Sequence, residues 1–390
     1  MPIAQKMQAV FGTVQNFLAY NATYEKWAGD PDAANFAFGN PHEMPLAQFV
    51  DTLKQAITPQ NKDWFAYKMS EPAARHTIAQ SLQKSHGIDF KASDISLTNG
   101  AFAALTIALR AVIDPGDEVI FITPPWFFYE ALIVDAGAVP VRVQVNPETF
   151  DLDLAAIEGA ITPKTRAIIV NSPNNPTGKI YPAETLEQLA QLLTSASERY
   201  GKPIYLLSDE AYRRIVFDDR QYISPAKFYP NTFVLYTYGK TLLTPGQRLG
   251  YVALPPDMPD REMIRNGLLL AQIVTGFAFP NALLQHSLPE LEKLSIDIPH
   301  LQHKRDWMVK ALREMGYTVH APEGTFYLLP RSPIEDDMAF CEMLAAYKIL
   351  CLPGKVVEMP GYFRISLTAN DEMIERALPG FAAVLEKSTV

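Results

Sequence analysis

Short apolar runs alternate with longer stretches in which apolar residues recur every three or four positions between about residues 94 and 238. Several of the short runs are continuous rather than alternating, which is typical of strands covered on both faces. The predicted strands are 94–98, 118–122, 139–145, 166–171, 204–210 and 233–238, and the predicted helices between them are 101–113, 128–137 and 182–201. Strand–helix alternation predicts an α/β fold with a mostly parallel, helix-covered sheet.

The pattern changes after about Leu291. A long helix over 301–316 is followed by short strand-like segments, a helix near 336–349 and a strand near 363–368, which indicates a smaller α+β domain. The chain is therefore expected to divide into an N-terminal arm with part of the small domain (1–44), a large domain (45–288) and a small C-terminal domain (289–390).

Composition is that of an ordinary globular protein, with 48% hydrophobic and 20% charged residues among 390. The net charge of −9 and the lack of a basic run argue against nucleic-acid and anionic-membrane surfaces. No apolar stretch approaches the roughly 20 residues that span a bilayer, and the start lacks a signal-peptide pattern. Two cysteines, Cys341 and Cys351, have neither a disulfide-framework nor a metal-ligand spacing. We therefore expect a cytoplasmic protein without a metal site.

Two loops follow predicted strands where ligands bind in open parallel sheets. In TNGAFAAL (98–105), a turn at Asn99-Gly100 opens an apolar helix, and helix N-termini of this kind bind anions. In SPNNPTG (172–178), two prolines make a rigid loop that presents asparagine side chains. Either loop alone is equally typical of a plain structural turn. Neither the dinucleotide fingerprint GxGxxG nor a P-loop occurs, which argues against an NAD-dependent dehydrogenase.

Asp209 closes an otherwise apolar strand in SDEAYRRIVF (208–217). A carboxylate there is costly unless it meets a positive partner, although a helix-capping role is an alternative. Tyr212 follows three residues later, on the same side if a helical turn forms.

The segment YGKTLLTPGQRLG (238–250) carries a lysine at the end of a buried strand and an arginine eight positions later. Desolvation favours the neutral, nucleophilic form of a lysine amine, which forms an imine with an aldehyde. Arg248 offers a planar fork of donors for a phosphate, and Thr237 adds a hydroxyl. An anion site, a phosphate-binding arginine, an imine-forming lysine and a carboxylate together predict one cofactor, pyridoxal 5′-phosphate (PLP), whose ring accepts electrons from a substrate carbanion.

From about Phe38 to Leu367 the chain resembles the class I/II aminotransferases, the fold-type I PLP-dependent enzymes that include aspartate aminotransferase. The resemblance implies that Lys240 is the Schiff-base lysine and proton carrier. It also implies cofactor contacts from Asp209 (ring nitrogen), Tyr212 and Asn175 (ring 3-oxygen), Trp126 (ring face), and, around the phosphate, Gly100, Ala101, Phe102, Thr237 and Arg248. For the substrate it implies Arg364 and Asn175 at the α-carboxylate and Gly39 in the closing small domain, beside Phe38.

The sequence departs from the family pattern in three places. The family often has serines before the lysine, whereas here Tyr238 either narrows the site or packs behind it. The family's phosphate-binding tyrosine from the partner subunit corresponds most closely to Tyr67, in a segment without the usual glycine. No second arginine for a dicarboxylate side chain is evident. The aromatic residues Phe38, Trp126, Tyr129 and Phe277 suggest an apolar or aromatic substrate, although an ordinary place in the core is an equal alternative for each except Trp126.

The resemblance implies amino transfer from an L-amino acid to a 2-oxo acid by a homodimer with shared active sites. A β-elimination lyase, a cyclase or an oxidase would keep the same residues, so reaction type rests on analogy. A non-catalytic regulator on this fold would need a DNA-binding domain, and only about forty residues without a basic cluster precede FGNP (38–41).

Overall fold

The structure is a computed structural model that describes residues 2–388. Its centre is a seven-stranded sheet with the order β2-β8-β7-β6-β5-β3-β4. Only β8 runs against the other six strands, because β3, β4, β5, β6 and β7 pair in parallel and β8 is antiparallel to both β7 and β2. The strands are β2 (Ile95–Thr98), β3 (Glu118–Thr123), β4 (Val139–Gln144), β5 (Thr165–Asn171), β6 (Tyr205–Asp209), β7 (Thr232–Thr237) and β8 (Gly250–Ala253). The predicted mostly parallel α/β fold is confirmed.

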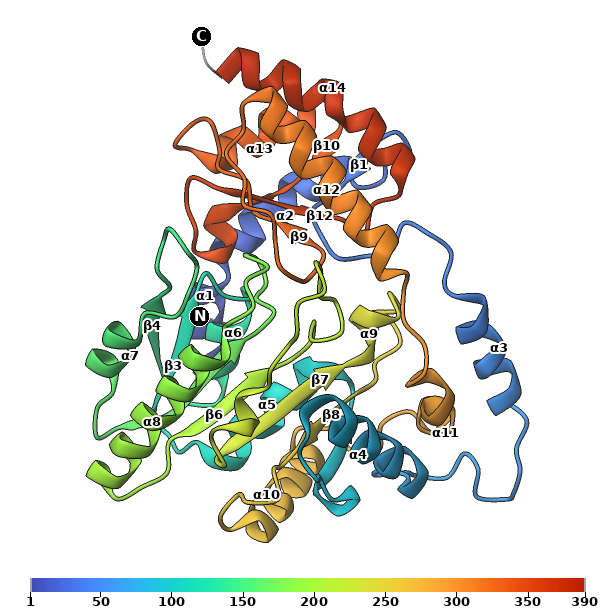
Figure 1. Ribbon diagram of the computed structural model, residues 1–390, viewed down its shortest axis with the longest axis vertical. Coiled ribbons are helices and arrows are strands. Elements are labelled where there is room, and N and C mark those ends of the chain that lie inside the picture. The colour runs from blue at the N-terminus through green and yellow to red at the C-terminus, as the bar shows by residue number, and fades with distance from the viewer. Residues whose placement is uncertain (1, 389–390) are drawn as a thin grey trace.

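Helices cover both faces of this sheet (Figure 1). Strands β6 and β7 are buried along their whole length and β5 is buried except at Arg166, which explains their continuous apolar sequences. The covering helices are α4 (Pro72–His86), α5 (Gly100–Val112), α6 (Tyr129–Asp135), α7 (Leu154–Ala160), α8 (Ala183–Tyr200), α10 (Arg261–Val274) and α11 (Ala282–Leu291). Helix α3 (Ala47–Ala56) lies farther out and packs against α11. Helix α8 ends at Gly201, whose φ of 65° is the left-handed conformation expected of a glycine cap.

A smaller α+β part lies above the large sheet in Figure 1. It contains an antiparallel sheet of order β11-β12-β9, from Leu352–Pro353, Phe363–Ser366 and Tyr327–Leu328. Helices α12 (Ile298–Met315), α13 (Asp337–Ala346) and α14 (Asp371–Ser388) pack around it. Strand β1 (Ala34–Asn35) pairs in parallel with β10 (Ile349–Leu350), so the segment before Phe38 packs with the C-terminal part of the chain.

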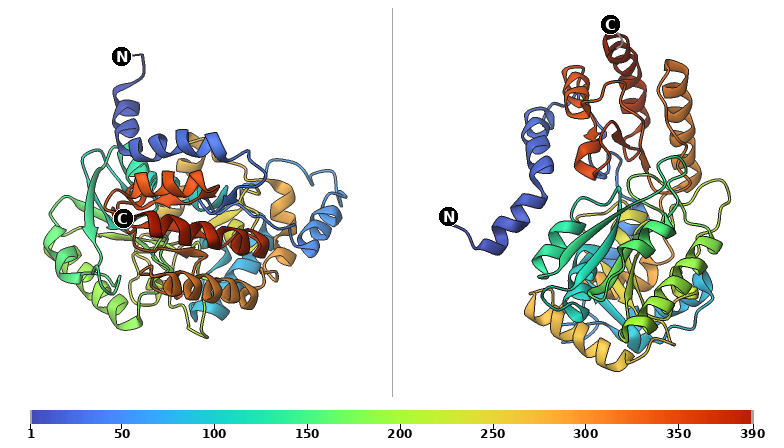
Figure 2. Two further views of the ribbon diagram at one scale, coloured as in Figure 1. Left: turned by 90° about the horizontal axis from the view of Figure 1, so that it is seen from above. Right: turned by 90° about the vertical axis from the view of Figure 1, so that its left-hand side faces the viewer.

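Two helices near the N-terminus had no counterpart in the sequence prediction. They are α1 (Gln5–Thr13) and α2 (Gln15–Trp27), and Figure 2 shows them along one side of the molecule. Helix α1 packs against α6 and α2 packs against α13, so the pair bridges the large and small parts of the structure. Neither helix has a side-chain cap or a strong apolar stripe in its sequence, which is why periodicity did not reveal them.

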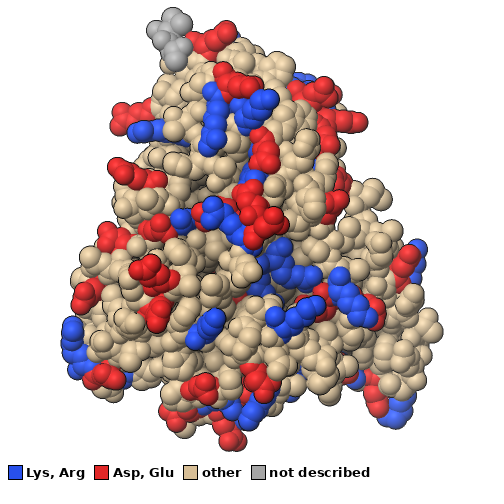
Figure 3. Space-filling view, in the orientation of Figure 1, with Lys and Arg blue, Asp and Glu red and all other residues tan. Residues whose placement is uncertain are grey.

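Acidic and basic side chains are interspersed over the face seen in Figure 3, with lysines and arginines gathered near its middle. Within residues 2–388, no helix is both long enough and apolar enough to cross a membrane. The same residues contain no group of three or more histidines, cysteines, aspartates or glutamates placed to hold a metal ion.

Candidate active site

A cavity of about 240 Å³ opens between the large sheet and the smaller part of the structure. The carboxyl ends of β5, β6 and β7 meet there, because parallel strands end at the same edge of a sheet. The N-terminal end of α5 and the residues after β1 form the other walls. Of fourteen residues predicted for the site, the cavity is lined by twelve: Phe38, Gly39, Ala101, Phe102, Trp126, Asn175, Asp209, Tyr212, Thr237, Lys240, Arg248 and Arg364.

Lys240 lies in the short helix α9 (Tyr238–Thr241), directly after β7. Its Nζ is 5.5 Å from the centre of the Tyr212 ring and 5.7 Å from that of Phe326. The side chain is partly exposed in the cavity rather than enclosed in the core. The amine is therefore accessible to a ligand while aromatic rings limit its freedom of movement.

Asp209 closes β6 and is buried. Its Oδ2 accepts a hydrogen bond from the Tyr129 hydroxyl at 2.6 Å, and its Oδ1 accepts one from the Ala211 amide at 3.2 Å. Burial raises the pKa of the carboxyl above its ordinary value, an effect that the Tyr129 and Ala211 bonds and the Lys240 charge oppose. Such a carboxylate is well suited to bind a protonated ring nitrogen, which would supply the missing charge partner.

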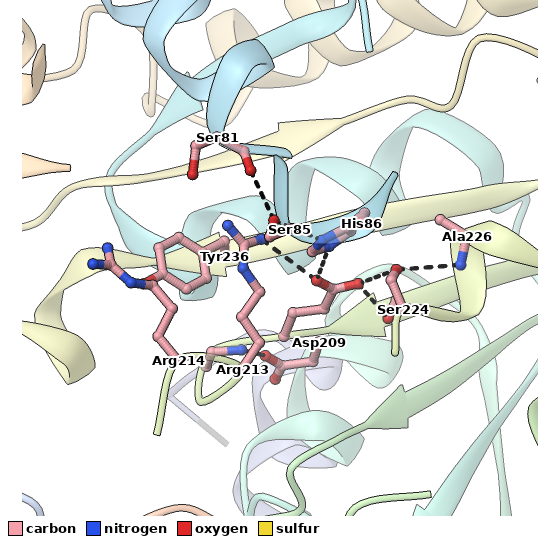
Figure 4. A network of polar contacts seen from close by, with 12 residues as sticks. Ser81, Ser85, His86, Asp209, Arg213, Arg214, Ser224, Ala226 and Tyr236 are labelled. Atoms are coloured by element: carbon pink, nitrogen blue, oxygen red, sulfur yellow. Dashed lines mark hydrogen bonds and ion pairs between the residues drawn. The ribbon is translucent and has the colours of Figure 1, made fainter. Parts of the chain in front are cut away.

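The neighbouring Glu210 is buried in a polar network with His86, Arg213 and Ser224, which Figure 4 labels. Its carboxylate contacts His86 at 2.9 Å and accepts hydrogen bonds from Ser224 at 2.6 Å and Ser208 at 3.1 Å. Arg213 approaches it at 3.4 Å. Burial favours the neutral acid, but His86, Arg213 and Ser224 together lower the pKa of Glu210 to about 2. The network therefore anchors the end of β6 from which Asp209 projects.

Arg364, on β12, is only 1% exposed and has no acidic partner among the described residues. Its Nη1 donates to Asn175 Oδ1 and its Nη2 to the Ala37 carbonyl, both at 2.9 Å, while its buried Nε has no acceptor. The guanidinium lies 4.0 Å from the centre of the Tyr327 ring. A buried cation without a counter-ion, next to an open cavity, indicates a site for an anionic ligand.

Another wall of the cavity is built around the N-terminus of α5. Gly100 has a φ of 84°, and a Cβ at this position would lie 2.7 Å from a guanidinium nitrogen of Arg248. Arg248 donates to the Pro245 carbonyl at 2.7 Å, and burial lowers its pKa. The amides at the start of α5, together with an arginine that has no acidic partner among the described residues, indicate a second site for an anion.

Two predicted site residues lie outside the cavity lining. Gly100 is next to it, against Arg248, whereas Tyr67 is 86% exposed and its ring centre lies 4.7 Å from that of Phe279. Tyr238 packs behind the site, since it is buried and its hydroxyl donates to Glu292. This contact resolves the two alternatives left open for Tyr238.

Of the two alternatives for Tyr129 and Phe277, a place in the core is the one that the structure shows, because neither residue lines the cavity. Tyr129 turns inward to Asp209, and Phe277 packs against the core beside α5 and α10. Sequence reasoning missed Tyr327, Phe127 and Asn171, which do line the cavity. Phe127 was adjacent to Trp126, but no sequence signal distinguished Tyr327 from an ordinary strand residue.

A family model described as aminotransferase class I and II matches residues 31–381. A probable aspartate/prephenate aminotransferase of Aquifex aeolicus is 29% identical over 369 residues, covering 91% of this chain and 92% of the relative. The aspartate/prephenate aminotransferase of Thermus thermophilus is 30% identical over 371 residues, covering 93% and 90%. A crystal structure of an amino transferase from Eubacterium rectale superposes with a TM-score of 0.91 at 31% identity and covers both chains completely.

Proposed function

The chain belongs to the class I and II aminotransferases, PLP-dependent enzymes that transfer an amino group, and we propose that Lys240 is the residue that carries the reaction in this member. The motifs alone left elimination, cyclisation and oxidation open as alternative reactions. Membership of this family favours transamination. One observation carries the residue assignment. The accessible amine of Lys240, just after β7, and the buried carboxylate of Asp209, at the end of the neighbouring strand β6, line one cavity. The same cavity contains Arg364, which is buried and has no acidic partner among the described residues.

The residues present fit PLP. The space that a Cβ of Gly100 would fill lies against Arg248, so a phosphate can approach the backbone there, with Thr237 beside it. Asp209 would hold the ring nitrogen, Tyr212 and Asn175 the ring 3-oxygen, and Trp126 the ring face. PLP supplies an aldehyde that binds amines and a protonated ring that accepts electrons.

Lys240 would bind the aldehyde covalently and, once displaced by the incoming amino acid, take the proton from the substrate α-carbon. The same amine would then give that proton to the carbon that had carried the aldehyde. The Tyr212 ring keeps the amine on one side of the cavity, 5.5 Å from the ring centre. Positioning of this amine beside the substrate α-carbon is the contribution of the protein that this contact supports.

Arg364 and Asn175 would hold the substrate α-carboxylate and so orient its Cα–H bond toward Lys240. Support comes from the buried Nε of Arg364 without an acceptor and from its existing bond to Asn175. Gly39 lies so close to Tyr327 that a Cβ would meet its hydroxyl at 2.7 Å, which fits a loop that must close tightly over a bound substrate. Closure of the smaller part would exclude water from the reaction.

We propose that the two parts are domains, with boundaries after residues 44 and 288. We also propose that the protein is a homodimer whose active sites are shared between subunits. Apolar side chains are exposed on α10 and near Tyr67: Met263, Leu269, Leu270, Ile273, Val274, Ile57, Phe65 and Phe279. Tyr67 would reach the phosphate of the partner's site. Sedimentation velocity of Leu270→Glu tests this, and a fully active wild-type monomer would contradict it.

We place the protein in the cytoplasm, in amino-acid biosynthesis. The two buried free cysteines, Cys341 and Cys351, suit a reducing compartment. Immunodetection after cell fractionation tests the compartment.

The central experiment is borohydride reduction of the PLP-loaded protein, followed by peptide mapping. We expect visible absorbance, a pyridoxyl group on Lys240, and loss of absorbance with release of a 2-oxo acid when an amino-acid substrate is added. Lys240→Ala should lack all three, while a matched surface change, Lys202→Ala, should retain them. A wild-type protein that labels another lysine would overturn the assignment.

A further inference from the structure

We propose that the substrate is an L-amino acid with one carboxylate and an apolar or aromatic side chain, and that Phe38 and Phe127 form the wall that selects it. This inference rests on the proposed function, because it uses the assigned places of the cofactor and the α-carboxylate. It concerns the remaining space in the cavity, which none of those assignments uses.

The cations of the cavity are the first part of the argument. Three cationic side chains line it, namely Lys240, Arg248 and Arg364. The aldehyde, the phosphate and the α-carboxylate would engage one each. A dicarboxylic amino acid would bring a further anion into a site without a fourth cation in its lining, and a carboxylate without a partner is costly to remove from water.

A partner subunit is the other possible source of a cation. The segment proposed to reach across the subunit boundary surrounds Tyr67, and its nearest lysines are Lys62 and Lys68. Both already have acidic partners, since Lys62 pairs with Asp63 at 2.9 Å and Lys68 with Glu71 at 3.2 Å. Both lysines of this segment thus already lie beside an acid, and its arginine, Arg75, is half-buried in α4 with its Nε enclosed.

The wall itself is aromatic and is supported from behind by helix α2. The Phe38 ring packs edge-on against Tyr24 with ring centres 4.8 Å apart, and it also contacts Phe17 at 6.2 Å. The Phe127 ring stacks on Phe17 at 4.9 Å with only 14° between the ring planes. One side chain outside the cavity, Phe17, therefore holds both cavity-lining rings in place.

Such a wall favours apolar surface for two reasons. It presents ring faces and edges without a hydrogen-bond donor that a carboxylate requires, and it gains from burying apolar atoms. Because α2 lies outside the large sheet and belongs to the N-terminal pair of helices, this part of the pocket can differ between relatives without changing the cofactor site.

Leucine and aspartate make a suitable substrate pair, because their side chains have nearly the same shape and differ in charge. We expect the PLP-loaded wild type to convert leucine or phenylalanine at a kcat/KM at least roughly 100-fold above that of aspartate. The readouts are single-turnover loss of visible absorbance and the 2-oxo acid released.

Phe17→Ala tests the supporting ring, and Phe11→Ala, on the exposed side of α1, is its matched control. Phe17→Ala should lower kcat/KM for the apolar amino acids by roughly tenfold through KM, with the aspartate rate and the PLP dissociation constant unchanged. Equal or faster conversion of aspartate by the wild type would overturn the inference and leave the proposed function intact. Conversion of no amino acid by the loaded protein would overturn both.

Discussion

Arg364 offers the sharpest test of how this site holds a substrate. Arg364→Lys keeps the positive charge but removes the planar fork of donors. The native guanidinium uses one nitrogen on Asn175 and one on Ala37, stacks on Tyr327 at 4.0 Å, and has a buried Nε without an acceptor. The remaining donors are available for a carboxylate, and a lysine would recover at most part of that interaction.

The expected size follows from the number of charge-assisted bonds lost. A bidentate pair has two, each contributing about 1.5–3 kcal/mol, and a lysine retains one of them. Loss of the second corresponds to a decrease in kcat/KM of roughly 10- to 150-fold. Because the carboxylate is bound before and during proton removal, most of the decrease should appear in KM.

The assay compares an amino acid with the amine that lacks its α-carboxylate. Single-turnover decay of the visible absorbance gives a second-order rate constant for each. Arg364→Lys should lower the rate constant for the amino acid and leave that for the amine within about twofold. Arg331→Lys, at an exposed arginine of the smaller part, is the matched control. An equal loss for acid and amine would refute the carboxylate role, since it would indicate general damage to the site.

Three further substitutions test the support of the cofactor site. Tyr129→Phe removes the 2.6 Å bond to Asp209, so the pKa of that carboxyl should rise and the PLP dissociation constant should increase roughly tenfold; an unchanged constant would contradict this role. Glu210→Gln tests the lowered pKa of Glu210, about 2 against an ordinary 4.5. The folded protein favours the charged form of Glu210. The contribution of this carboxylate to the free energy of unfolding is therefore complete above pH 4.5 and is lost as the pH falls toward 2. Between pH 5 and pH 3, urea denaturation of the wild type should therefore lose about 2 kcal/mol more than that of the variant, and parallel profiles would contradict the assignment. Tyr327→Phe keeps the ring that stacks on Arg364 but removes the hydroxyl. Burial raises the pKa of this hydroxyl, but Lys240, Arg364 and Tyr212 together lower it below its ordinary value. We expect kcat to fall roughly tenfold with KM nearly unchanged, and a rise in KM alone would show that the ring rather than the hydroxyl matters.

Local pattern was sufficient for the central sheet and for the residues at its carboxyl edge. Continuous apolar runs are a consequence of burial on both faces, so β5, β6 and β7 were predicted within one or two residues of their observed bounds. Asp209 and Lys240 stood out for a related reason, since a charged group directly after such a run conflicts with burial unless it has a use.

The direction of individual side chains and the contacts between distant segments could be seen only in the folded structure. Tyr129 and Phe127 are two positions apart, yet one turns to Asp209 and the other lines the cavity, because a helix start places neighbouring side chains on different sides. Arg364 donates a hydrogen bond to Asn175, which is 189 positions away in the sequence. Phe17 contacts Phe38 and Phe127 from helix α2, which the hydrophobic periodicity of the sequence did not predict. The sequence by itself thus determined which groups we propose to carry the chemistry, since residue type and strand position determine charge and burial. The tertiary structure alone decided which rings surround the substrate, because packing between distant segments depends on the whole fold.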